Sequence, residues 1–196
     1  MTILTIRTFL PNAASTRRLG GAVAEVLEGG DVVLLIGELG AGKTTLTKGL
    51  VGALGGTEEV TSPTFTLMHL YETAPPVAHV DCWRLEDLAD LVDLGLDEVL
   101  DDGGVAVIEW GELAVPLLGR DALTVSIDLA AEDQAGPLHH PAFGGECAEP
   151  GRVVLLSATG ERWSRRMRHL EMACREAGLA TDTLGGQLHD EPAPSR

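Results

Sequence analysis

The 196 residues, 44% of them hydrophobic, suffice for one domain of good size with a proper core. Because the net charge is −16, the chain has no general attraction to nucleic acid, and contact with RNA or DNA would need a local basic patch. The three cysteines lie far apart without a C-x-x-C pair, which excludes a disulfide framework and is typical of a reducing compartment. No apolar run is long enough to span a membrane, and the N-terminus lacks a signal-peptide pattern. We therefore expect a cytoplasmic protein with no membrane or DNA partner.

The chain opens with a predicted strand that is followed by a predicted helix. Apolar residues within 3–9 indicate the strand, and a proline ends it. The helix is expected to have Ser15 or Thr16 as its N-terminal cap and to run to Leu27, where a Gly-Gly pair follows.

The next stretch, residues 31–54, reads DVVLLIGELGAGKTTLTKGLVGAL and is the centre of the sequence. Its apolar run at 32–36 has the length of a strand buried on both faces, and apolar residues at helical spacing over 45–54 indicate a helix with one buried face. Between them, residues 37–44 match G-x-x-x-x-G-K-[ST], the phosphate-binding loop. The strand before this motif and the helix after it argue against a chance match.

The residue types of this loop suit a nucleotide with its magnesium ion. Glycines let backbone N–H groups turn inward around phosphate oxygens, and the following helix adds the positive end of its dipole. Lys43 can reach the β- and γ-phosphates, while the Thr44 hydroxyl can take one place on Mg²⁺. The loop residues expected to bind the nucleotide are Gly37, Glu38, Leu39, Gly40, Ala41, Gly42, Lys43, Thr44 and Thr45.

A hydroxyl-rich segment, TSPTFT at residues 61–66, follows this unit and precedes a predicted strand over 66–71. A threonine in such a loop, Thr64 for example, could sense the γ-phosphate, because a hydroxyl or backbone N–H there adds a Mg²⁺ ligand or an anchor. An ordinary turn stabilised by Ser and Thr side chains explains the same residues. The sequence leaves both alternatives open.

The apolar strand predicted at 77–81 (VAHVD) ends in an acidic residue, as a Walker B element does. The Asp81 carboxylate can hold Mg²⁺ or its water across the loop from Thr44. A lone aspartate at a strand end is common, but the phosphate-binding loop before it strengthens the prediction. His79 within this strand is expected to be a packed, hydrogen-bonded histidine rather than a ligand.

A second predicted strand, residues 105–109 (VAVIE), also ends in an acid. Ligands lie at the carboxyl ends of strands in open α/β sheets, so Glu109 could orient the attacking water or complete the surroundings of Mg²⁺. A strand-end salt bridge is the alternative for Glu109. Trp110, which follows it, is expected in the core on either view.

Residues 85–100 (LEDLADLVDLGLDEVL) alternate leucine and acid at helical spacing and predict one strongly acidic helix. Such a run is usually only a solvated face. Docking of a basic partner is the alternative.

The C-terminal part combines further predicted elements with irregular segments. Strands are predicted at 122–129 and 152–158, a helix at 160–177, a loop insertion at 130–151 and a disordered tail from 181 onward. The helix carries the chain's basic patch, which is a place for phosphate or RNA contact or simply a solvated face. Its basic residues are Arg162, Arg165, Arg166 and Arg168.

Together these elements predict an α/β protein with a single P-loop NTPase-type domain of three layers around a mixed central sheet. The domain is expected to span residues 1–178, including the loop insertion, and the disordered tail to span 179–196.

Several of these segments recur together in one family. GELGAGKTTLTKGL, SPTFTL, HVDCWRL, DLGLDEVL and VAVIEW, in this order, resemble the bacterial tRNA threonylcarbamoyladenosine biosynthesis ATPases, the small P-loop family TsaE. The resemblance covers residues 12–129 and extends to RVVLLSATGERW at 152–163. The combination of S-P-T, H-x-D-x-[YW]-R-L and I-E-W is specific to this family, whereas the phosphate-binding loop alone would not be.

The resemblance implies a role for each matching residue. Thr44 would bind Mg²⁺, Asp81 would be the Walker B-like carboxylate and Glu109 a carboxylate that orients Mg²⁺ or water. Thr64 would act as a switch-like threonine, and Lys43, Thr64, Asp81 and Glu109 would be the catalytic residues. The further residues implied at ATP are Trp110, Arg152, Asn12 and Ala13, the last two close to the adenine.

The resemblance also implies an activity and partners. Members of the family are weak ATPases alone, and they join the threonylcarbamoyl-transferring protein and its paralogous companion. ATP hydrolysis then supports repeated modification of tRNA adenosine-37, so that this chain would meet tRNA through the complex. The sequence departs from the family pattern at Trp83, where a tyrosine is usual, and in its longer loop at 130–151 and longer tail.

Two other classes of function compete with this one. A small-molecule kinase would use the arginines of residues 160–177 as a phosphate lid, but the sequence offers no motif for an acceptor pocket. A GTPase-type switch would read its base with N-K-x-D, and neither of the two lysines follows an asparagine.

Overall fold

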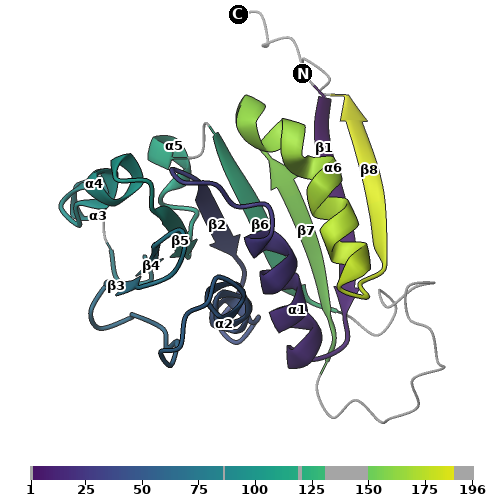
Figure 1. Ribbon diagram of the computed structural model, residues 1–196, viewed down its shortest axis with the longest axis horizontal. Helices are drawn as coiled ribbons and strands as arrows, with labels where there is room; N and C mark the ends of the chain where they lie inside the picture. Colours follow the sequence, from purple (N-terminus) through teal and green to yellow (C-terminus); the bar gives the residue numbers. More distant parts are fainter. Residues whose placement is uncertain (1, 86, 119–120, 131–149, 188–196) are drawn as a thin grey trace, which may run out of the picture.

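An eight-stranded mixed sheet forms the centre of the computed structural model (Figure 1). The structure describes residues 2–85, 87–118, 121–130 and 150–187. The strands are β1 (Thr2–Leu10), β2 (Val32–Ile36), β3 (Met68–Tyr71), β4 (Val77–Asp81), β5 (Val105–Glu109), β6 (Ala122–Leu129), β7 (Arg152–Ala158) and β8 (Thr181–Gln187). The helices are α1 (Ala13–Ala24), α2 (Lys43–Ala53), α3 (Leu88–Val92), α4 (Leu96–Asp101), α5 (Val115–Leu118) and α6 (Gly160–Glu176).

The strands lie in the order β3-β4-β5-β2-β6-β7-β1-β8. The neighbours β4, β5, β2 and β6 are parallel, whereas β3, β7, β1 and β8 run antiparallel to the strands beside them. Parallel strands are covered on both faces and therefore need continuous apolar runs. The runs VVLLI in β2 and VAVIE in β5 meet this requirement, and both strands are buried almost throughout.

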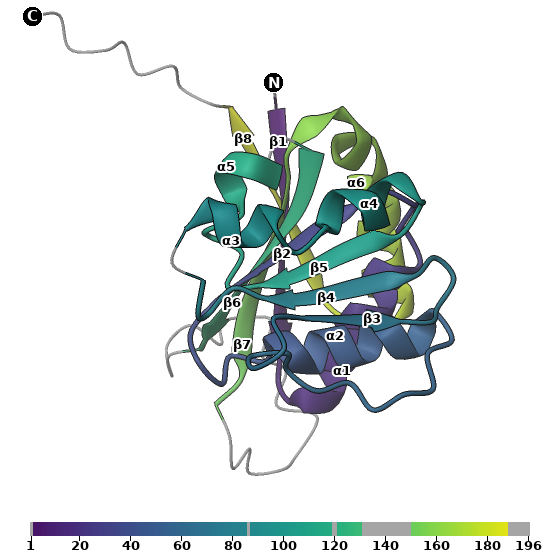
Figure 2. The same ribbon diagram turned by 90° about the vertical axis from the view of Figure 1, so that its left-hand side faces the viewer.

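Helices cover both faces of the sheet, so the fold has three layers (Figures 1 and 2). One apolar cluster joins α1, α2 and α6 to inward residues such as Val33 and Leu35 of β2. A second cluster joins α3 and α4 to Leu34 of the same strand and to Ile108 of β5. Successive strand residues thus point to opposite layers. The predicted three-layer α/β domain with a mixed sheet is confirmed, and no described helix is long and apolar enough to cross a membrane.

Helices α1 and α2 pack with their backbones in contact, and two glycines make this possible. A Cβ atom on Gly20 would lie 2.1 Å from the Leu46 carbonyl oxygen, and one on Gly49 would lie 2.0 Å from the Arg17 carbonyl oxygen. Any side chain at these positions would force the helices apart. The contact holds the start of α1 beside the start of α2, which matters for the site described below.

The N-terminus of α1 is capped by a different residue from those predicted. Asn12, not Ser15 or Thr16, is the N-cap: its side-chain oxygen accepts from the Ser15 N–H at 3.0 Å, and Ser15 Oγ accepts from the Asn12 N–H at 3.1 Å. This reciprocal pair satisfies two backbone donors at the helix end. Asparagine caps helices as well as serine does, so the residue type at position 12 was a signal that the prediction passed over.

The single acidic helix predicted over 85–100 is in fact two short helices. α3 ends at Val92, and α4 starts at Leu96 after Gly95, which has a left-handed backbone with φ 68°. Glycine adopts this conformation at little cost, and it terminates a helix. The leucine spacing continued across Gly95 and hid the break.

The tail predicted to be disordered contains a strand. β8 pairs antiparallel with β1 from Thr2↔Gln187 to Thr8↔Thr181. Without β8, the edge of β1 would present unpaired backbone groups, and pairing satisfies them whatever the side chains are. The sequence TDTLGGQ has no apolar run to announce a strand. The sheet therefore continues past the predicted domain end at 178. The rest of the predicted tail, residues 188–196, lies outside the described residues, and so does most of the predicted insertion, residues 131–149.

A buried ion pair joins α6 to the turn before β2. Arg166 donates from its two terminal nitrogens to the two carboxylate oxygens of Asp31, at 2.6 and 2.7 Å. Asp31 is 1% exposed and also accepts the Glu28 N–H at 2.7 Å. The hydrogen bond to Asp31 is the main cause that raises the pKa of Arg166 above its ordinary value. The pair fixes the position of α6 on the sheet.

We predict that Arg166→Ala lowers the free energy of unfolding by about 3 kcal/mol, because it leaves the Asp31 carboxylate buried without its main partner. Urea denaturation followed by circular dichroism measures this. Arg165→Ala is the control: its ion pair with Glu161 on the same helix is largely exposed and should contribute less than about 0.5 kcal/mol. Equal losses in the two variants would contradict the structural role of the Arg166–Asp31 pair.

Candidate functional site

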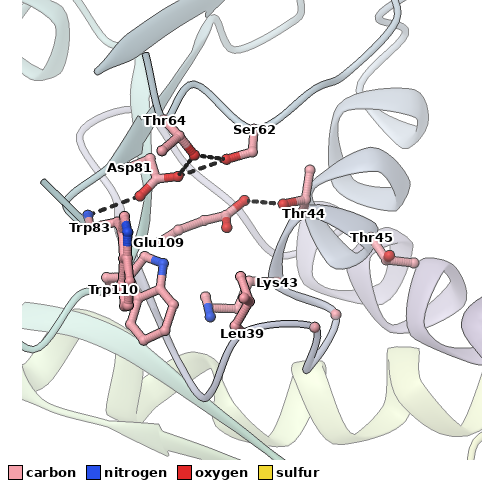
Figure 3. A pocket seen from close by; sticks show the side chains of 12 residues that line it. Leu39, Lys43, Thr44, Thr45, Ser62, Thr64, Asp81, Trp83, Glu109 and Trp110 are labelled. Carbon is pink, nitrogen blue, oxygen red and sulfur yellow. Dashed lines mark hydrogen bonds between the residues drawn. The ribbon is translucent and has the colours of Figure 1, made fainter. Parts of the chain in front are cut away.

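A cavity of about 380 Å³ opens where β2, β4 and β5 end (Figure 3). The parallel register sets Asp81 of β4 beside Glu109 of β5, and Leu35 of β2 on the other side of Glu109. The phosphate-binding loop leaves β2 one residue later, so all three strand ends meet at one edge. The residues that line the cavity are Leu39, Gly40, Gly42, Lys43, Thr44, Thr45, Ser62, Thr64, Asp81, Trp83, Glu109 and Trp110.

The phosphate-binding loop leads directly into α2. Gly42 is the N-cap of this helix and has a left-handed backbone with φ 115°, which an L side chain adopts only under strain. The loop is fastened from outside as well: Arg152 at the start of β7 donates from Nε to the Ala41 carbonyl oxygen at 3.2 Å. A Cβ on Gly42 would also lie 3.5 Å from Thr16 of α1. The N–H groups of such a loop and of the helix N-terminus that follows it are able to bind an anion.

Lys43 is held inside the loop, although it is a charged residue. Its Nζ donates to the carbonyl oxygens of Gly37 at 2.5 Å and Glu38 at 2.9 Å, and the side chain is buried. Burial lowers the pKa of Lys43, while the carboxylates of Glu109, Glu112 and Asp81 oppose this shift. The ammonium group therefore lies among acceptors at the point where the motif requires a cation.

Trp110 covers this lysine. The Lys43 Nζ lies 3.6 Å from the centroid of the indole ring, a cation–π contact in a partly buried place. Trp83 packs against Trp110, with ring centroids 4.4 Å apart. Trp110 has a left-handed backbone with φ 56°, which costs about 1–3 kcal/mol for a residue with a bulky side chain. Such strain is typical of functional sites. The expectation that Trp110 lies in the core is only partly met, since it packs on the core and also lines the cavity.

Glu109 connects the phosphate-binding loop to the sheet. The Thr44 hydroxyl donates to Glu109 Oε1 at 2.7 Å, and His79 Nε2 lies 2.9 Å from the same oxygen. Both Glu109 and His79 are buried. The strand-end salt bridge that was the alternative for Glu109 has a counterpart in this contact with His79, while Glu109 also lines the cavity. His79 is packed and hydrogen-bonded, as the sequence predicted.

Asp81 holds the hydroxyl-rich loop. Its Oδ2 accepts from Ser62 at 2.7 Å and from Thr64 at 2.6 Å, and its Oδ1 accepts the Trp83 N–H at 2.9 Å (Figure 3). The two open alternatives for the loop are therefore not exclusive: its hydroxyls stabilise a turn, and the turn lies at the cavity. It is Glu109, and not Asp81, that contacts Thr44, which is the contact expected of a Walker B carboxylate.

The oxygen atoms at this edge fit a magnesium ion. Thr44, Asp81 and Glu109 supply a hydroxyl and carboxylates, the hard ligands that Mg²⁺ prefers. Among the described residues, no three His, Cys, Asp or Glu side chains gather into a cage. Mg²⁺ in nucleotide sites does not need one, because it keeps several waters and binds a few carboxylates together with substrate phosphates.

Three residues expected at the nucleotide do not line the cavity in the described structure. Asn12 and Ala13 are exposed at the start of α1, the helix whose Thr16 lies near Gly42, and Arg152 contacts the loop through the Ala41 carbonyl oxygen. The arginines of α6 lie elsewhere. Arg162 and Arg166 contact Gly29 and Asp31, which precede β2, whereas the cavity lies at the opposite end of that strand. They cannot form the phosphate lid of a kinase from this position.

Sequence reasoning missed two side chains of the cavity and a third that supports it. Ser62 was part of the hydroxyl-rich segment without a role of its own, and Trp83 was noted only as an exchange for tyrosine. His79 was predicted to be packed and hydrogen-bonded, but its link to Glu109 was not predicted. A spacing of two residues between His79 and Asp81 puts both side chains on one face of β4, and this periodicity could have linked them.

Exposed apolar side chains lie on the loops that line the cavity: Leu39 and Trp83 line it, and Phe65 follows the lining residue Thr64. Phe65 is 83% exposed, Leu39 is 81% exposed and Trp83 is 55% exposed. The Arg84 guanidinium lies 4.5 Å from the centroid of the Phe65 ring. Aromatic residues and arginine are enriched at the energetic centres of protein interfaces. We call Leu39, Phe65 and Trp83 the apolar rim.

Comparison with known proteins gives one consistent result. The family model of the threonylcarbamoyl adenosine biosynthesis protein TsaE matches residues 10–136. The chain is 43% identical over 152 residues to the tRNA threonylcarbamoyladenosine biosynthesis protein TsaE of Streptomyces coelicolor, covering 76% of this chain and 93% of that protein. It is 40% identical over 166 residues to the Bacillus subtilis protein of the same name, covering 84% and 89%.

A solved structure agrees with the sequence comparisons. The crystal structure of YdiB from Bacillus subtilis is similar with a TM-score of 0.61 and 30% identity, covering 91% of this chain and 96% of that chain. The family resemblance seen in the sequence motifs is thereby confirmed over the phosphate-binding loop and both strand-end acids. Since the match extends over most of its length and to the whole fold, this chain belongs to the TsaE family.

Proposed function

We propose that this protein binds and hydrolyses ATP with Mg²⁺, and that hydrolysis supports the threonylcarbamoyl modification of adenosine-37 in tRNA. The observation that carries the proposal is the hydrogen bond from Thr44 to Glu109, which joins a phosphate-binding loop to a strand-end carboxylate within one cavity. The names of the relatives in Streptomyces coelicolor and Bacillus subtilis supply the pathway. We expect the protein in the cytoplasm, where tRNA is modified.

In this proposal, the loop and α2 bind the triphosphate. The backbone N–H groups of residues 37–45 surround the phosphates, and Lys43 exchanges the carbonyl oxygens of Gly37 and Glu38 for phosphate oxygens. Asn12 and Ala13, at the start of the helix that brings Thr16 to Gly42, would approach the base. Arg152 keeps the loop in shape through the Ala41 carbonyl group.

Thr44 and Glu109 would hold Mg²⁺, with Asp81 nearby in the same cavity. The bound ion would neutralise the charge that develops on the phosphates. Because the Thr44 hydroxyl hydrogen points to Glu109, its oxygen lone pairs remain available to the cavity. Thr64, held by Asp81 at the same cavity, would respond to the γ-phosphate, and its loop would carry that response outward.

We further propose that the protein works as a subunit. Its own hydrolysis would be slow, and docking on the threonylcarbamoyl transferase and its paralogous companion would regulate it. The apolar rim supports this proposal, because it offers a partner a desolvated contact beside the nucleotide. Contact with tRNA would then be made through the complex, in agreement with the net charge of −16.

ATP hydrolysis by the purified protein, alone and then with the two partner proteins and tRNA, tests the proposal. A slow rate that rises with the partners supports it. A rate that ignores them but produces a phosphorylated small hydroxyl compound would instead indicate the kinase.

We predict that Lys43→Ala lowers the rate of ATP hydrolysis at least about a hundredfold, because the ammonium group that stabilises the β- and γ-phosphates is removed. A steady-state phosphate-release assay measures the rate. Lys48→Ala is a matched control, since Lys48 is the only other lysine of the chain and lies further along α2, away from the cavity lining. If Lys43→Ala kept the wild-type rate, the hydrolysis mechanism would be excluded.

We predict that Phe65→Ala weakens binding to the reconstituted transferase and companion about tenfold, which corresponds to about 1.4 kcal/mol. Titration calorimetry in the presence of a non-hydrolysable ATP analogue measures this affinity. Met172→Ala is the control, because Met172 is an exposed apolar side chain on α6, outside the apolar rim. A loss confined to Met172→Ala would place the docking surface on α6 and contradict the prediction.

A further inference from the structure

We infer that His79 is a positioning residue that fixes the Glu109 carboxylate and thereby determines which of its oxygens serves the nucleotide. The inference rests on the proposed function, since it concerns the same cavity. Both hydrogen bonds of the Glu109 side chain end on one atom: Oε1 accepts the Thr44 hydroxyl at 2.7 Å and faces His79 Nε2 at 2.9 Å.

The second oxygen of Glu109 has a different environment. No hydrogen bond within the described part of the chain ends on Oε2, and Glu109 lines the cavity. Two donors approaching one carboxylate oxygen from different elements, α2 and β4, restrict rotation of the carboxylate plane. Oε1 is therefore the anchored atom, and Oε2 is the atom that remains to accept from a water or to bind the magnesium ion.

The surroundings of His79 show that packing alone does not explain this residue. It is fully buried in the middle of β4, and its ring centroid lies 6.2 Å from that of Tyr71. Its Nδ1 has no hydrogen-bond partner among the described residues. A buried polar atom without a partner destabilises the fold, and an apolar side chain at this position would avoid that cost. The imidazole, unlike an apolar side chain, makes the contact with Glu109.

The geometry also assigns the ring hydrogen. A carboxylate oxygen only accepts, so the hydrogen of the His79–Glu109 bond lies on Nε2. The Nε2–H group belongs to a buried ring on a strand of the sheet, so its direction is fixed. The Thr44 hydroxyl hydrogen, in contrast, can rotate about the Cβ–Oγ1 bond. Without His79, Glu109 would keep only the rotatable donor. Removal of a group that orients such a ligand typically costs about 10–100-fold in metal affinity or activity.

Three variants test the inference. His79→Leu fills the space without a donor, whereas His79→Gln places an amide N–H near the position of Nε2. His69→Leu is the control. His69 is the β3 residue directly paired with His79, and its ring packs edge-on against Tyr71. Urea denaturation first establishes that each variant is folded under the conditions of the assay.

We expect His79→Leu to lower kcat about tenfold or more with the KM for ATP changed less than about threefold, and His79→Gln to recover most of that loss. A second measurement is the affinity for a fluorescent non-hydrolysable ATP analogue, with and without Mg²⁺. We expect the gain in affinity that Mg²⁺ brings to be about tenfold smaller in His79→Leu than in the wild type. Binding without metal should be unchanged in His79→Leu, and His69→Leu should behave as the wild type does. Equal losses in the two His79 variants, or equal losses of metal-free and Mg²⁺-dependent binding, would overturn the inference in favour of packing.

A further measurement separates this inference from the proposed function. In the protein without nucleotide, ¹⁵N NMR of the His79 ring should show the hydrogen on Nε2, and Glu109→Ala should change that signal while the His69 signal stays. If the protein hydrolyses no ATP, the function proposal fails, and the NMR and analogue-binding results still decide on His79. A hydrogen on Nδ1, or a His79 signal unchanged by Glu109→Ala, would overturn the inference.

Discussion

The parallel register of β4, β5 and β2 is the constraint on which the site depends. It sets Asp81 and Glu109 side by side and puts Leu35, two residues before the start of the phosphate-binding loop, on the other side of Glu109. A shift of one residue in any of these strands would turn the corresponding acid to the other face of the sheet. The two apolar clusters, one on each face, hold this register because successive strand residues belong to different clusters. The chemistry of the cavity is thus secured by the core.

The two acids divide their contacts between different parts of the chain. Glu109 is bonded to the loop that would bind phosphate, and Asp81 is bonded to the hydroxyls of Ser62 and Thr64. Because these acids are neighbours in the sheet, a structural change in the phosphate-binding loop and one in the hydroxyl-rich loop would act on adjacent strands. The left-handed backbones of Leu67 and Trp110 flank this pair of acids. Strained residues on both sides of one site indicate that its shape is fixed at some cost in stability.

Much of this could be predicted from local sequence signals. The apolar run before the phosphate-binding motif and the helical spacing after it located β2, the loop and α2, and the strand-end acids located the other side of the cavity. The three-layer α/β fold followed from these elements. The break at Gly95 was hidden because the leucine spacing continues across it, and β8 was hidden because its pairing with β1 depends on backbone groups rather than on side chains.

The partners of individual side chains could not be predicted. Whether Asp81 or Glu109 would face Thr44 depends on strand order, and no residue type in either strand encodes that β5 lies next to β2. The same holds for Arg166, whose partner Asp31 is 135 residues away in the sequence. An arginine on a helix face resembles a free basic patch until the packing of that helix is known. The spacing of apolar residues along the chain does not indicate long-range contacts of this kind.

The place of β1 in the sheet has a consequence for how the chain is made. Its two neighbouring strands are β7 and β8, and the side chains of Thr5 and Ser157, which meet across one of these pairs, are 152 residues apart. On a ribosome, β1 emerges long before either neighbour and must wait with apolar residues such as Ile6 uncovered. Arg152, which steadies the phosphate-binding loop, arrives with β7. The contact that steadies this loop therefore forms only after the strand that pairs with β1 has been synthesised.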